Sequence, residues 1–474
     1  MKLHFYGGAQ VVTGVNYLLE TDKSKILIDC GLLQGSKEME AKNYDDFSYD
    51  AKDIDAVIIS HSHLDHIGRL PQLVSAGFKG KIFATLPAAD FTRLILEDSV
   101  KILAEKAQHA GVAPMFSQGE VDEVMRHFIA VDYYKKTPAT GDISFTFHDA
   151  GHILGSAIIE VEVEGPPSSA TADSGEASKK IVFSGDLGHP PAPLLRAPDY
   201  LTSADYVLVE STYGDRNHES PDDCKEKIEN VIEDTISRGG VLLIASFAME
   251  RTQQLLYHLN DLVEHRRIPR VPVFIDSPLA THLTEIYEKY PQYYNKEAVY
   301  EIDSGDDIFN FPGLRFTPTS AESKKINEVP PPKIIIAGSG MSQGGRITHH
   351  EIRYLPDPRT TLLMVGYQAE GTLGRRLANG EKRVHILDQE VTVNAKIEKI
   401  SGYSAHADQQ YLMDWVKSFT KPCYVNGDQE CHGLKKVFVV QGEPEPAQTL
   451  AGLIRDELGV EAVVPKAGEM VELD

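Results

Sequence analysis

The chain has 474 residues, 42% of them hydrophobic, and a formal net charge of −23. This length predicts two domains rather than one core, and no apolar run approaches the roughly 20 residues of a membrane span. Nonspecific nucleic-acid binders usually carry a basic surface, so the charge excludes that class. If the protein handles a polyanion, its positive charge must be concentrated at one site and aided by metal ions.

The cysteines of the chain indicate a reducing compartment. Cys30, Cys224, Cys423 and Cys431 are widely scattered, unlike the cysteines of a disulfide framework. The first residues enter a strand-like pattern without the features of a signal peptide, so we expect a cytoplasmic protein. Cys423, Cys431 and His432 could form a small metal clip, although incidental thiols in a loop are the simpler explanation.

Short strands alternate with a few helices in residues 1–205. Several early strands are separated only by glycine-containing turns, which favours a mixed or antiparallel sheet. The predicted strands are 2–6, 16–20, 26–29, 54–60, 81–84, 143–147, 157–163 and 181–184.

The rhythm changes to strand, helix, strand, helix in residues 206–400. Its strands are continuous apolar runs, as in a parallel sheet covered on both faces. Small or polar residues follow several of these runs, and ligands bind beyond the carboxyl ends of such strands. The predicted strands are 206–210, 241–245, 271–275, 333–337 and 362–365. The segment 401–474 returns to strand, helix, strand, predicted at 437–440, 446–458 and 463–465.

The segment His61-Ser62-His63-Leu64-Asp65-His66 is the strongest functional signal. It lies between a predicted buried strand and a run of leucine and isoleucine at helical spacing. Imidazole nitrogen and carboxylate oxygen are ligands that zinc prefers. His61 and His63 can converge on one ion, while Asp65 and His66 point around the turn to a second. A solvated polar loop would seldom hold four potential ligands in so short a segment.

Four further candidate ligands follow apolar runs elsewhere in the chain. They are Asp29, His152, Asp186 and Glu210. Taken singly, a carboxylate after a strand is usually a cap or turn residue. Their order around the histidine-rich segment, by contrast, is highly specific.

With these motifs in this order, the chain resembles the metallo-β-lactamase superfamily. Its later motifs resemble the β-CASP branch of RNA- and DNA-processing nucleases, and above all the nuclease subunit of the cleavage and polyadenylation specificity factor and its compact prokaryotic relatives. The resemblance implies an αββα metallo-β-lactamase fold formed by residues 1–205 and 401–474. A doubly wound α/β β-CASP domain, residues 206–400, would be inserted into it.

The resemblance also implies a two-zinc centre, with Mn²⁺ as an alternative ion. Asp29 matches a carboxylate that supports the ligands from behind. The implied ligands are His61, His63 and His152 for one zinc, Asp65 and His66 for the other, and Asp186 as a bridge between both.

Two further motifs of the branch concern proton transfer. Glu210 matches its acidic motif A. His406, in Ser404-Ala405-His406-Ala407-Asp408, matches the motif B histidine, which that acid holds and which would protonate the leaving oxygen. With Asp65 and Asp186 these two residues form the implied catalytic set. The pair could equally be a structural hydrogen bond that joins the two domains.

One motif departs from the family pattern. Motif C usually reads Val-His-Gly-Glu, whereas this chain has Gln441 at the histidine's place, followed by Gly442 and Glu443. A glutamine amide oxygen is a poor zinc ligand beside imidazole, so the second ion should bind more weakly. Three outcomes remain open: a dinuclear enzyme with a loosened second site, a one-metal or altered-specificity hydrolase, and an inactive scaffold.

Residues for contacting further phosphates are expected in the inserted domain. Arg251 opens a predicted helix, and Ser339 and Gly340 begin a Gly/Ser-rich turn after a strand. Backbone N–H groups in such turns can cradle an oxyanion, and Ser277 is a weaker candidate. Ordinary helix entries are the structural alternative.

The expected function is that of a zinc-dependent ribonuclease hydrolysing single-stranded RNA between the two domains. Both endonuclease and 5′-to-3′ exonuclease activities agree with the resemblance, which also allows a homodimer. One alternative is a noncatalytic RNA-processing partner with a degraded second metal site. Another is a one-metal hydrolase of a different phosphodiester or ester.

Overall fold

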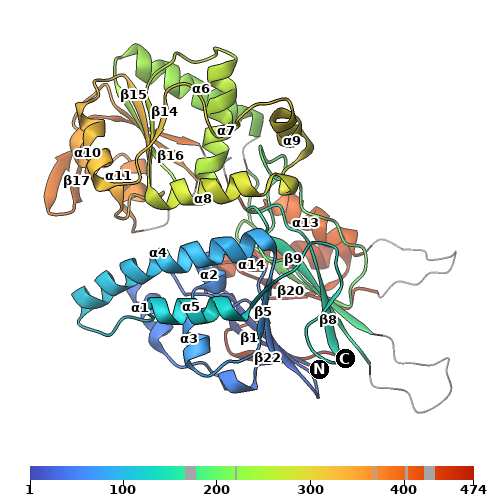
Figure 1. Ribbon diagram of the computed structural model, residues 1–474. Helices are drawn as coiled ribbons and strands as arrows, with labels where there is room; N and C mark the ends of the chain where they lie inside the picture. The colour runs from blue at the N-terminus through green and yellow to red at the C-terminus, as the bar shows by residue number, and fades with distance from the viewer. Residues whose placement is uncertain (166–177, 219–220, 367, 369–370, 401–403, 421–432) are drawn as a thin grey trace, which may run out of the picture. The chain divides into compact units, whose positions relative to one another are not determined.

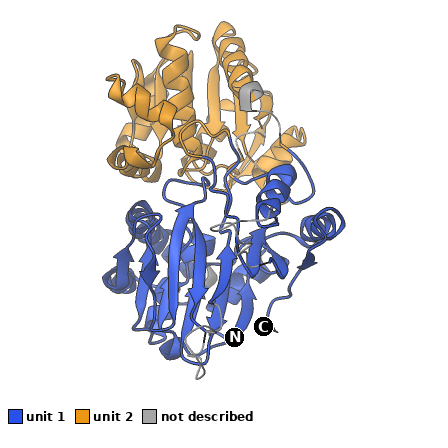
Figure 2. Ribbon diagram, turned by 90° about the vertical axis from the view of Figure 1, so that its right-hand side faces the viewer, with its two compact units in different colours: residues 1–190, 197–217, 406–474 blue, residues 191–196, 218–405 orange. Residues whose placement is uncertain are grey.

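The computed structural model describes residues 1–165, 178–218, 221–366, 368, 371–400, 404–420 and 433–474. The chain divides into two compact units, coloured separately in Figure 2. Unit 1 comprises residues 1–190, 197–217 and 406–474, and unit 2 comprises residues 191–196 and 218–405. Within the described parts of the chain, no helix is both long and apolar enough to cross a membrane.

The first sheet of unit 1 is mixed. Its order is β22-β1-β2-β3-β4-β5-β6, antiparallel from β22 to β3 and parallel from β3 to β6. The strands are β1 (Lys2–Gly7), β2 (Asn16–Glu20), β3 (Lys25–Ile28), β4 (Ala56–Ile58), β5 (Lys81–Ala84), β6 (Phe128–Ala130) and β22 (Glu469–Glu472).

The second sheet of unit 1 is also mixed and has the order β21-β20-β11-β10-β9-β8-β7. Its strands from β7 to β10 are antiparallel, and those from β10 to β21 are parallel. They are β7 (Thr137–Pro138), β8 (Ile143–Asp149), β9 (Ala157–Val163), β10 (Lys179–Phe183), β11 (Tyr206–Glu210), β20 (Lys436–Val440) and β21 (Glu461–Val463).

The two sheets enclose a common hydrophobic core. Alternate residues of a strand point to opposite faces, and β8 accordingly buries Ile143, Phe145 and Phe147 while the residues between them are partly exposed. These side chains belong to one cluster with Leu3 and Phe5 of β1 in the other sheet. The core of unit 1 therefore lies between two packed sheets.

Helices cover the outer faces of this sandwich. Leu27, Val57 and Ile82 lie on the face of the first sheet that points away from the core, and they are fully buried; helices α2 to α5 pack together on this part of the unit (Figure 1). On the second sheet, Trp415 and Leu450 of α13 and α14 join a cluster with Val207 of β11. The predicted αββα layering is confirmed. The helices of unit 1 are α1 (Lys37–Ala41), α2 (Leu64–Ile67), α3 (Leu70–Ser75), α4 (Leu86–Ala110), α5 (Gln118–His127), α13 (Gln409–Ser418) and α14 (Pro444–Leu453).

Unit 2 is built on a parallel sheet of order β14-β13-β15-β12-β16-β19. Every residue of β12, β15 and β16 is buried, because helices cover both faces, as Figure 1 shows. The predicted doubly wound α/β architecture is confirmed. The strands are β12 (Val241–Ala245), β13 (Val273–Asp276), β14 (Leu314–Phe316), β15 (Lys333–Ala337), β16 (Thr361–Val365) and β19 (Lys396–Ile400), with a hairpin of β17 (Arg383–Ile386) and β18 (Gln389–Thr392).

The helices of unit 2 connect these strands in the alternating order that the sequence predicts. They are α6 (Pro221–Ser237), α7 (Arg251–Glu264), α8 (Pro278–Lys289), α9 (Lys296–Asp303), α10 (Ser320–Lys325), α11 (Arg346–Tyr354) and α12 (Leu373–Ala378).

One strand lies in a different unit from the one that the sequence assigned. Residues 206–210 were expected to open the inserted domain, but β11 belongs to unit 1. It pairs in parallel with β10 on one side and with β20 on the other. Its apolar run suits both sheets equally, and only pairing with strands remote in sequence decides between them.

Candidate metal centre

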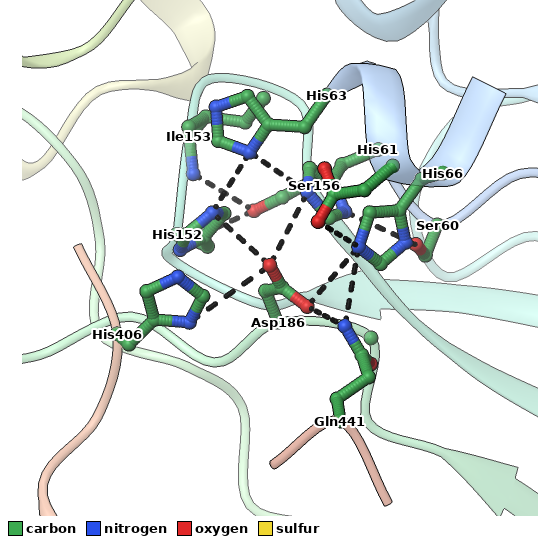
Figure 3. Close-up of polar contacts among 12 residues, drawn as sticks. Ser60, His61, His63, His66, His152, Ile153, Ser156, Asp186, His406 and Gln441 are labelled. Atoms are coloured by element: carbon green, nitrogen blue, oxygen red, sulfur yellow. Dashed lines mark hydrogen bonds and ion pairs between the residues drawn. The ribbon is translucent and has the colours of Figure 1, made fainter. Parts of the chain in front are cut away.

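Loops at the ends of strands bring the candidate metal ligands of unit 1 together, as Figure 3 shows. The loop after β4 carries His61 and His63, and the loop after β8 carries His152. Asp186 follows β10, and Gln441 follows β20. All of these loops leave carboxyl ends of strands in unit 1, where side chains can converge without interrupting a sheet.

Four side chains form a compact group with donor atoms facing one another. His63 Nδ1 lies 3.0 Å from His61 Nε2 and 3.2 Å from His152 Nε2. Asp186 Oδ2 lies 3.5 Å from the Nε2 atoms of both His61 and His152. A tetrahedral zinc with bonds of about 2.0–2.1 Å has ligand–ligand edges of about 3.3 Å. The spacing of these four donors, all mutually within reach of one ion, therefore fits one divalent metal.

Hydrogen bonds behind His61 fix which of its nitrogens faces the group. Asp29 Oδ2 accepts a hydrogen bond of 2.6 Å from Ser60 Oγ, and its Oδ1 accepts one of 2.7 Å from the Ser60 backbone N–H. Because the single hydroxyl proton of Ser60 goes to Asp29, Ser60 Oγ accepts from His61 Nδ1, 3.1 Å away. This tautomer leaves the Nε2 lone pair of His61 for a metal.

Electrostatics also favour neutral imidazole and ionised carboxylate. Burial, together with the neighbouring His66 ring, holds the pKa of His61 well below its usual range. Burial opposes ionisation of Asp186, but the neighbouring His66 ring outweighs it and holds the pKa of Asp186 well below its usual range. Both side chains therefore have the charge state that a metal ligand requires.

The loop that carries His152 is held by Ser156 and by close backbone packing. Ser156 Oγ accepts hydrogen bonds from the backbone N–H groups of His152 and Ile153, at 3.0 and 3.2 Å. A Cβ atom on Gly188 would lie 2.0 Å from the carbonyl oxygen of Gly151. Only glycine at residue 188 permits this approach, which brings the Asp186 loop against the His152 loop.

The residues expected at a second ion, Asp65, His66 and Asp186, also lie close together. Gln441 contacts two of them. His66 Nε2 is 3.4 Å from Asp186 Oδ1 and 3.9 Å from Asp65 Oδ2. Asp29 Oδ2 lies 2.7 Å from His66 Nδ1 and so orients this ring. Gln441 Nε2 lies 2.6 Å from Asp186 Oδ1 and 3.2 Å from His66 Nε2. Gln441 thus contacts both His66 and Asp186, and its place at a second ion stays a prediction.

Glu210 and His406 form a pair beside the four-ligand group. Glu210 is fully buried at the end of β11, and its Oε1 accepts a 2.7 Å hydrogen bond from Leu187 N–H. His406 Nδ1 lies 3.2 and 3.1 Å from the two carboxylate oxygens of Glu210, and 3.8 Å from Asp186 Oδ2. Burial alone would lower the pKa of His406, but the Glu210 carboxylate outweighs it and raises the pKa to about 9.

The candidate phosphate-binding residues lie in unit 2, at the carboxyl ends of three adjacent strands. Asp276 of β13 and Ala245 of β12 both pair with Ala337 of β15, so the loops after them begin side by side. Arg251 opens α7, and Ser277 caps α8 by accepting from Ala280 N–H at 3.2 Å.

Ser339 and Gly340 follow β15 in the same row of loops. Ser339 Oγ accepts a 2.8 Å hydrogen bond from Gln343 N–H, and the Gly340 carbonyl accepts one of 3.0 Å from Gln368 Nε2. Arg251 is largely buried, and its Nη1 donates to Gln254 Oε1 at 3.0 Å. These groups all have structural partners, and their role toward phosphate stays a prediction.

Two supporting residues were absent from the sequence prediction. Ser60 and Ser156 organise the ligand loops, and only their positions next to His61 and near His152 could have drawn attention to them. The proposed clip of Cys423, Cys431 and His432 lies outside the described residues. Cys30 and Cys224 are both buried.

Three family models match consecutive parts of the chain. Residues 10–235 match the metallo-beta-lactamase superfamily, residues 252–377 the Beta-Casp domain, and residues 390–465 the Zn-dependent metallo-hydrolase RNA specificity domain. The three matches follow the order in which unit 1, unit 2 and the return to unit 1 occur along the chain.

Several characterised proteins are similar over nearly the whole chain. Ribonuclease TTHA0252 of Thermus thermophilus is 35% identical over 94% of this chain and 97% of its own length. Transcription termination factor FttA of Methanosarcina mazei is 32% identical over 96% of this chain and 69% of its own. An RNase J-like protein of Methanocaldococcus jannaschii is 31% identical over 99% of both chains.

Solved structures include the same fold. A protein of unknown function from Enterococcus faecalis V583 matches with a TM-score of 0.55 and 12% identity, over 100% of this chain and 99% of its own. That likeness concerns the fold alone. The family matches and the relatives with more than 30% identity together show that the chain belongs to the β-CASP family of the metallo-β-lactamase superfamily of metal-dependent hydrolases.

Proposed function

We propose that this protein is a ribonuclease that hydrolyses phosphodiester bonds of single-stranded RNA at a zinc centre in unit 1. The observation that carries the proposal is the group of His61, His63, His152 and Asp186, whose spacing fits a tetrahedral ion. The names of the ribonuclease and RNase J-like relatives support RNA as the substrate class. When bound, the ion supplies the Lewis acidity that activates water for attack on phosphorus.

In this proposal His406 is the general acid. Its Nδ1 faces the Glu210 carboxylate, which fixes the ring and keeps it protonated, so Nε2 is the nitrogen that gives its proton to the departing ribose oxygen. Glu210 acts as a positioning residue, because Leu187 N–H and His406 both hold its carboxylate. Unit 2 would supply contacts to further phosphates through Arg251, Ser277, Ser339 and Gly340.

A cleavage assay on defined nucleic acids tests the proposal. The zinc- or manganese-loaded protein should cleave single-stranded RNA faster than single-stranded DNA or duplex RNA of the same sequence. His63→Ala should abolish cleavage, because it removes one of the four ligands. His385→Ala is the matched control, since this histidine is exposed on β17 in unit 2, and it should leave the rate unchanged.

The ends of the RNA decide between the two modes of cleavage. Circular RNA has no 5′ end, so its cleavage requires an endonuclease, whereas degradation only of linear RNA with a 5′-monophosphate indicates a 5′-to-3′ exonuclease. RNA that binds without being cleaved at any zinc or manganese concentration would contradict the proposal and support a noncatalytic RNA-processing partner.

A further inference from the structure

Gln441 is held rigidly at the metal centre by its backbone. The residue follows β20 with a left-handed φ of 46° and is 2% exposed. Its N–H donates to the Gly8 carbonyl at 2.7 Å, and its carbonyl accepts from Thr212 Oγ1 at 3.2 Å. The backbone is therefore fixed on both sides, and the direction in which the side chain leaves it is set by the fold.

The side-chain amide of Gln441 contacts two residues that would otherwise face a second cation. Gln441 Nε2 is 2.6 Å from Asp186 Oδ1 and 3.2 Å from His66 Nε2. Asp186 Oδ1 accepts hydrogen bonds only, so the amide group that faces it must be the N–H₂ end, because an amide oxygen would repel the carboxylate at this distance. His66 Nε2 lies 3.2 Å from the same amide nitrogen, and Asp29 Oδ2, 2.7 Å from His66 Nδ1, holds the ring in this position.

The two oxygens of Asp186 consequently have different partners. Oδ2 belongs to the group with His61, His63 and His152, whereas Oδ1 accepts from the glutamine amide. A second ion could bind Oδ1 only if the amide gave up this hydrogen bond to a charged acceptor, which belongs to the stronger class of hydrogen bonds. The amide N–H₂ thus lies between the same two side chains that a second ion would join.

We propose that the Gln441 amide replaces the second metal ion, so that this protein works with a single tightly bound divalent ion on His61, His63, His152 and Asp186. The inference rests on the proposed metal-dependent hydrolase function and specifies its metal content. The amide hydrogens partly neutralise Asp186 Oδ1 and fix the carboxylate, as the second cation would. The loss of one imidazole ligand and the competing hydrogen bond should make binding of a second ion at least about 100-fold weaker than that of the first.

Metal content measured by elemental analysis tests this inference without any assay of activity. After loading with zinc and dialysis against metal-free buffer, the full-length protein should retain about one ion per chain. Calorimetric titration should show one tight site and a second at least about 100-fold weaker. Two tight ions in the unmodified protein would overturn the proposal, whatever happens to the variants.

Two substitutions test whether the Gln441 amide takes the place of the second ion or is itself a ligand of the bound ion. Gln441→His supplies an imidazole beside His66 and Asp186, so this variant should retain about two ions per chain. Gln441→Ala removes the amide without supplying a ligand and should retain about one. If Gln441→Ala instead loses the tightly bound ion, the amide is itself a ligand of that ion and the proposal is wrong.

Electron paramagnetic resonance of the manganese-loaded protein provides an independent readout. Adjacent Mn²⁺ ions couple magnetically, so the Gln441→His variant should show a coupled spectrum and the unmodified protein that of an isolated ion. A coupled spectrum from the unmodified protein would overturn the inference. A protein with one ion that never cleaves RNA would contradict the proposed function only, and an active ribonuclease with two tight ions would contradict this inference only.

Discussion

His406, the acid of the proposed reaction, is positioned by a residue that lies far away in the sequence. Glu210 ends β11 in the second sheet, and His406 precedes α13. Their hydrogen bonds of 3.1 and 3.2 Å place the imidazole beside Asp186. A side chain that protonates a leaving group must be held in this manner, because proton transfer requires a fixed donor position.

His406→Ala should lower the rate of RNA cleavage by about 10²–10⁴-fold. The expected signature is rescue by a substrate with sulfur in place of the departing ribose oxygen, because a thiolate leaves without being protonated. Rate constants for the oxygen and sulfur substrates, measured for both proteins under single-turnover conditions, check this. An equal loss with both substrates would show that His406 does not supply the proton.

Glu351 of α11 makes the stability of unit 2 depend on pH. The side chain is fully buried, and Ser342 Oγ donates to its Oε1, while its Oε2 has no hydrogen-bond partner among the described residues. Burial raises the pKa of Glu351 from 4.5 to about 8. The folded state therefore keeps a proton that the unfolded chain releases above pH 4.5, so this contribution to stability is lost as the pH rises toward 8.

Glu351→Gln should remove this pH dependence, because glutamine resembles the neutral acid in shape and does not titrate in this range. Urea denaturation between about pH 5 and 8 should show the free energy of unfolding falling more steeply in the unmodified protein than in the variant. The two proteins should differ least at the acid end of the range. If the free energy of unfolding changed equally with pH in the two proteins, Glu351 would be ionised in the folded protein.

At the scale of elements, the short helix α2 is fixed by the loop that follows β3. Cys30 N–H donates to the His66 carbonyl at 2.7 Å, and Leu32 N–H donates to the Leu64 carbonyl at 2.9 Å. Between them, a Cβ atom on Gly31 would lie 1.5 Å from the carbonyl oxygen of Asp65. A helix of this length has little stability of its own, so this contact positions Asp65 and His66.

Gly31→Ala should reduce the free energy of unfolding by about 1–3 kcal/mol or more, because the added methyl group must push the backbone of α2 away. Gly141→Ala is the matched control, since nothing lies within 4 Å of its Cβ position, and it should change stability by less than about 0.5 kcal/mol. Urea denaturation of both variants measures the difference. Equal stability of the two would contradict a backbone contact at Gly31.

The sequence predicted the long apolar strands and the order of the ligand motifs, because those signals are local. It did not predict β6, β7, β14, β17, β18, β19 or β22, since short strands depend on partners rather than on their own patterns. The strand at 206–210 shows the same limit, because its sheet is decided by pairing with β10 and β20. The motif comparison identified Gln441 as unusual, but only the structure shows that its amide faces Asp186.

At the scale of the whole molecule, the candidate ligands belong to unit 1 alone. The loops after β4, β8 and β10 each contribute to the four-ligand group, so a bound ion would connect both sheets of the sandwich. An ion that binds only the folded state stabilises it by an amount that grows with occupancy, about 4 kcal/mol at a free concentration of 1,000 times Kd. The candidate ligand groups among the described residues all lie outside unit 2.

Removal of the metal should therefore lower the thermal stability of unit 1 and leave that of unit 2 unchanged. Hydrogen exchange monitored by mass spectrometry, with and without a chelator, reports the two units separately. Amides of β8 and β10 should lose protection when the metal is removed, and amides of β12 and β15 should keep theirs. Equal loss in both units would mean that the ion acts on the whole chain.

The order in which unit 1 is completed bears on the synthesis of the protein. The first 217 residues contribute most of unit 1, but residues 218–405 intervene before its remaining segment, 406–474. That segment carries His406 and Gln441 and the strands β20 and β22, which pair with β11 and β1. A ribosome that has translated only to residue 405 therefore holds a chain with neither the proposed acid nor a complete second sheet. If the protein degrades RNA as proposed, a chain at this stage of synthesis lacks the residue that would protonate the leaving group.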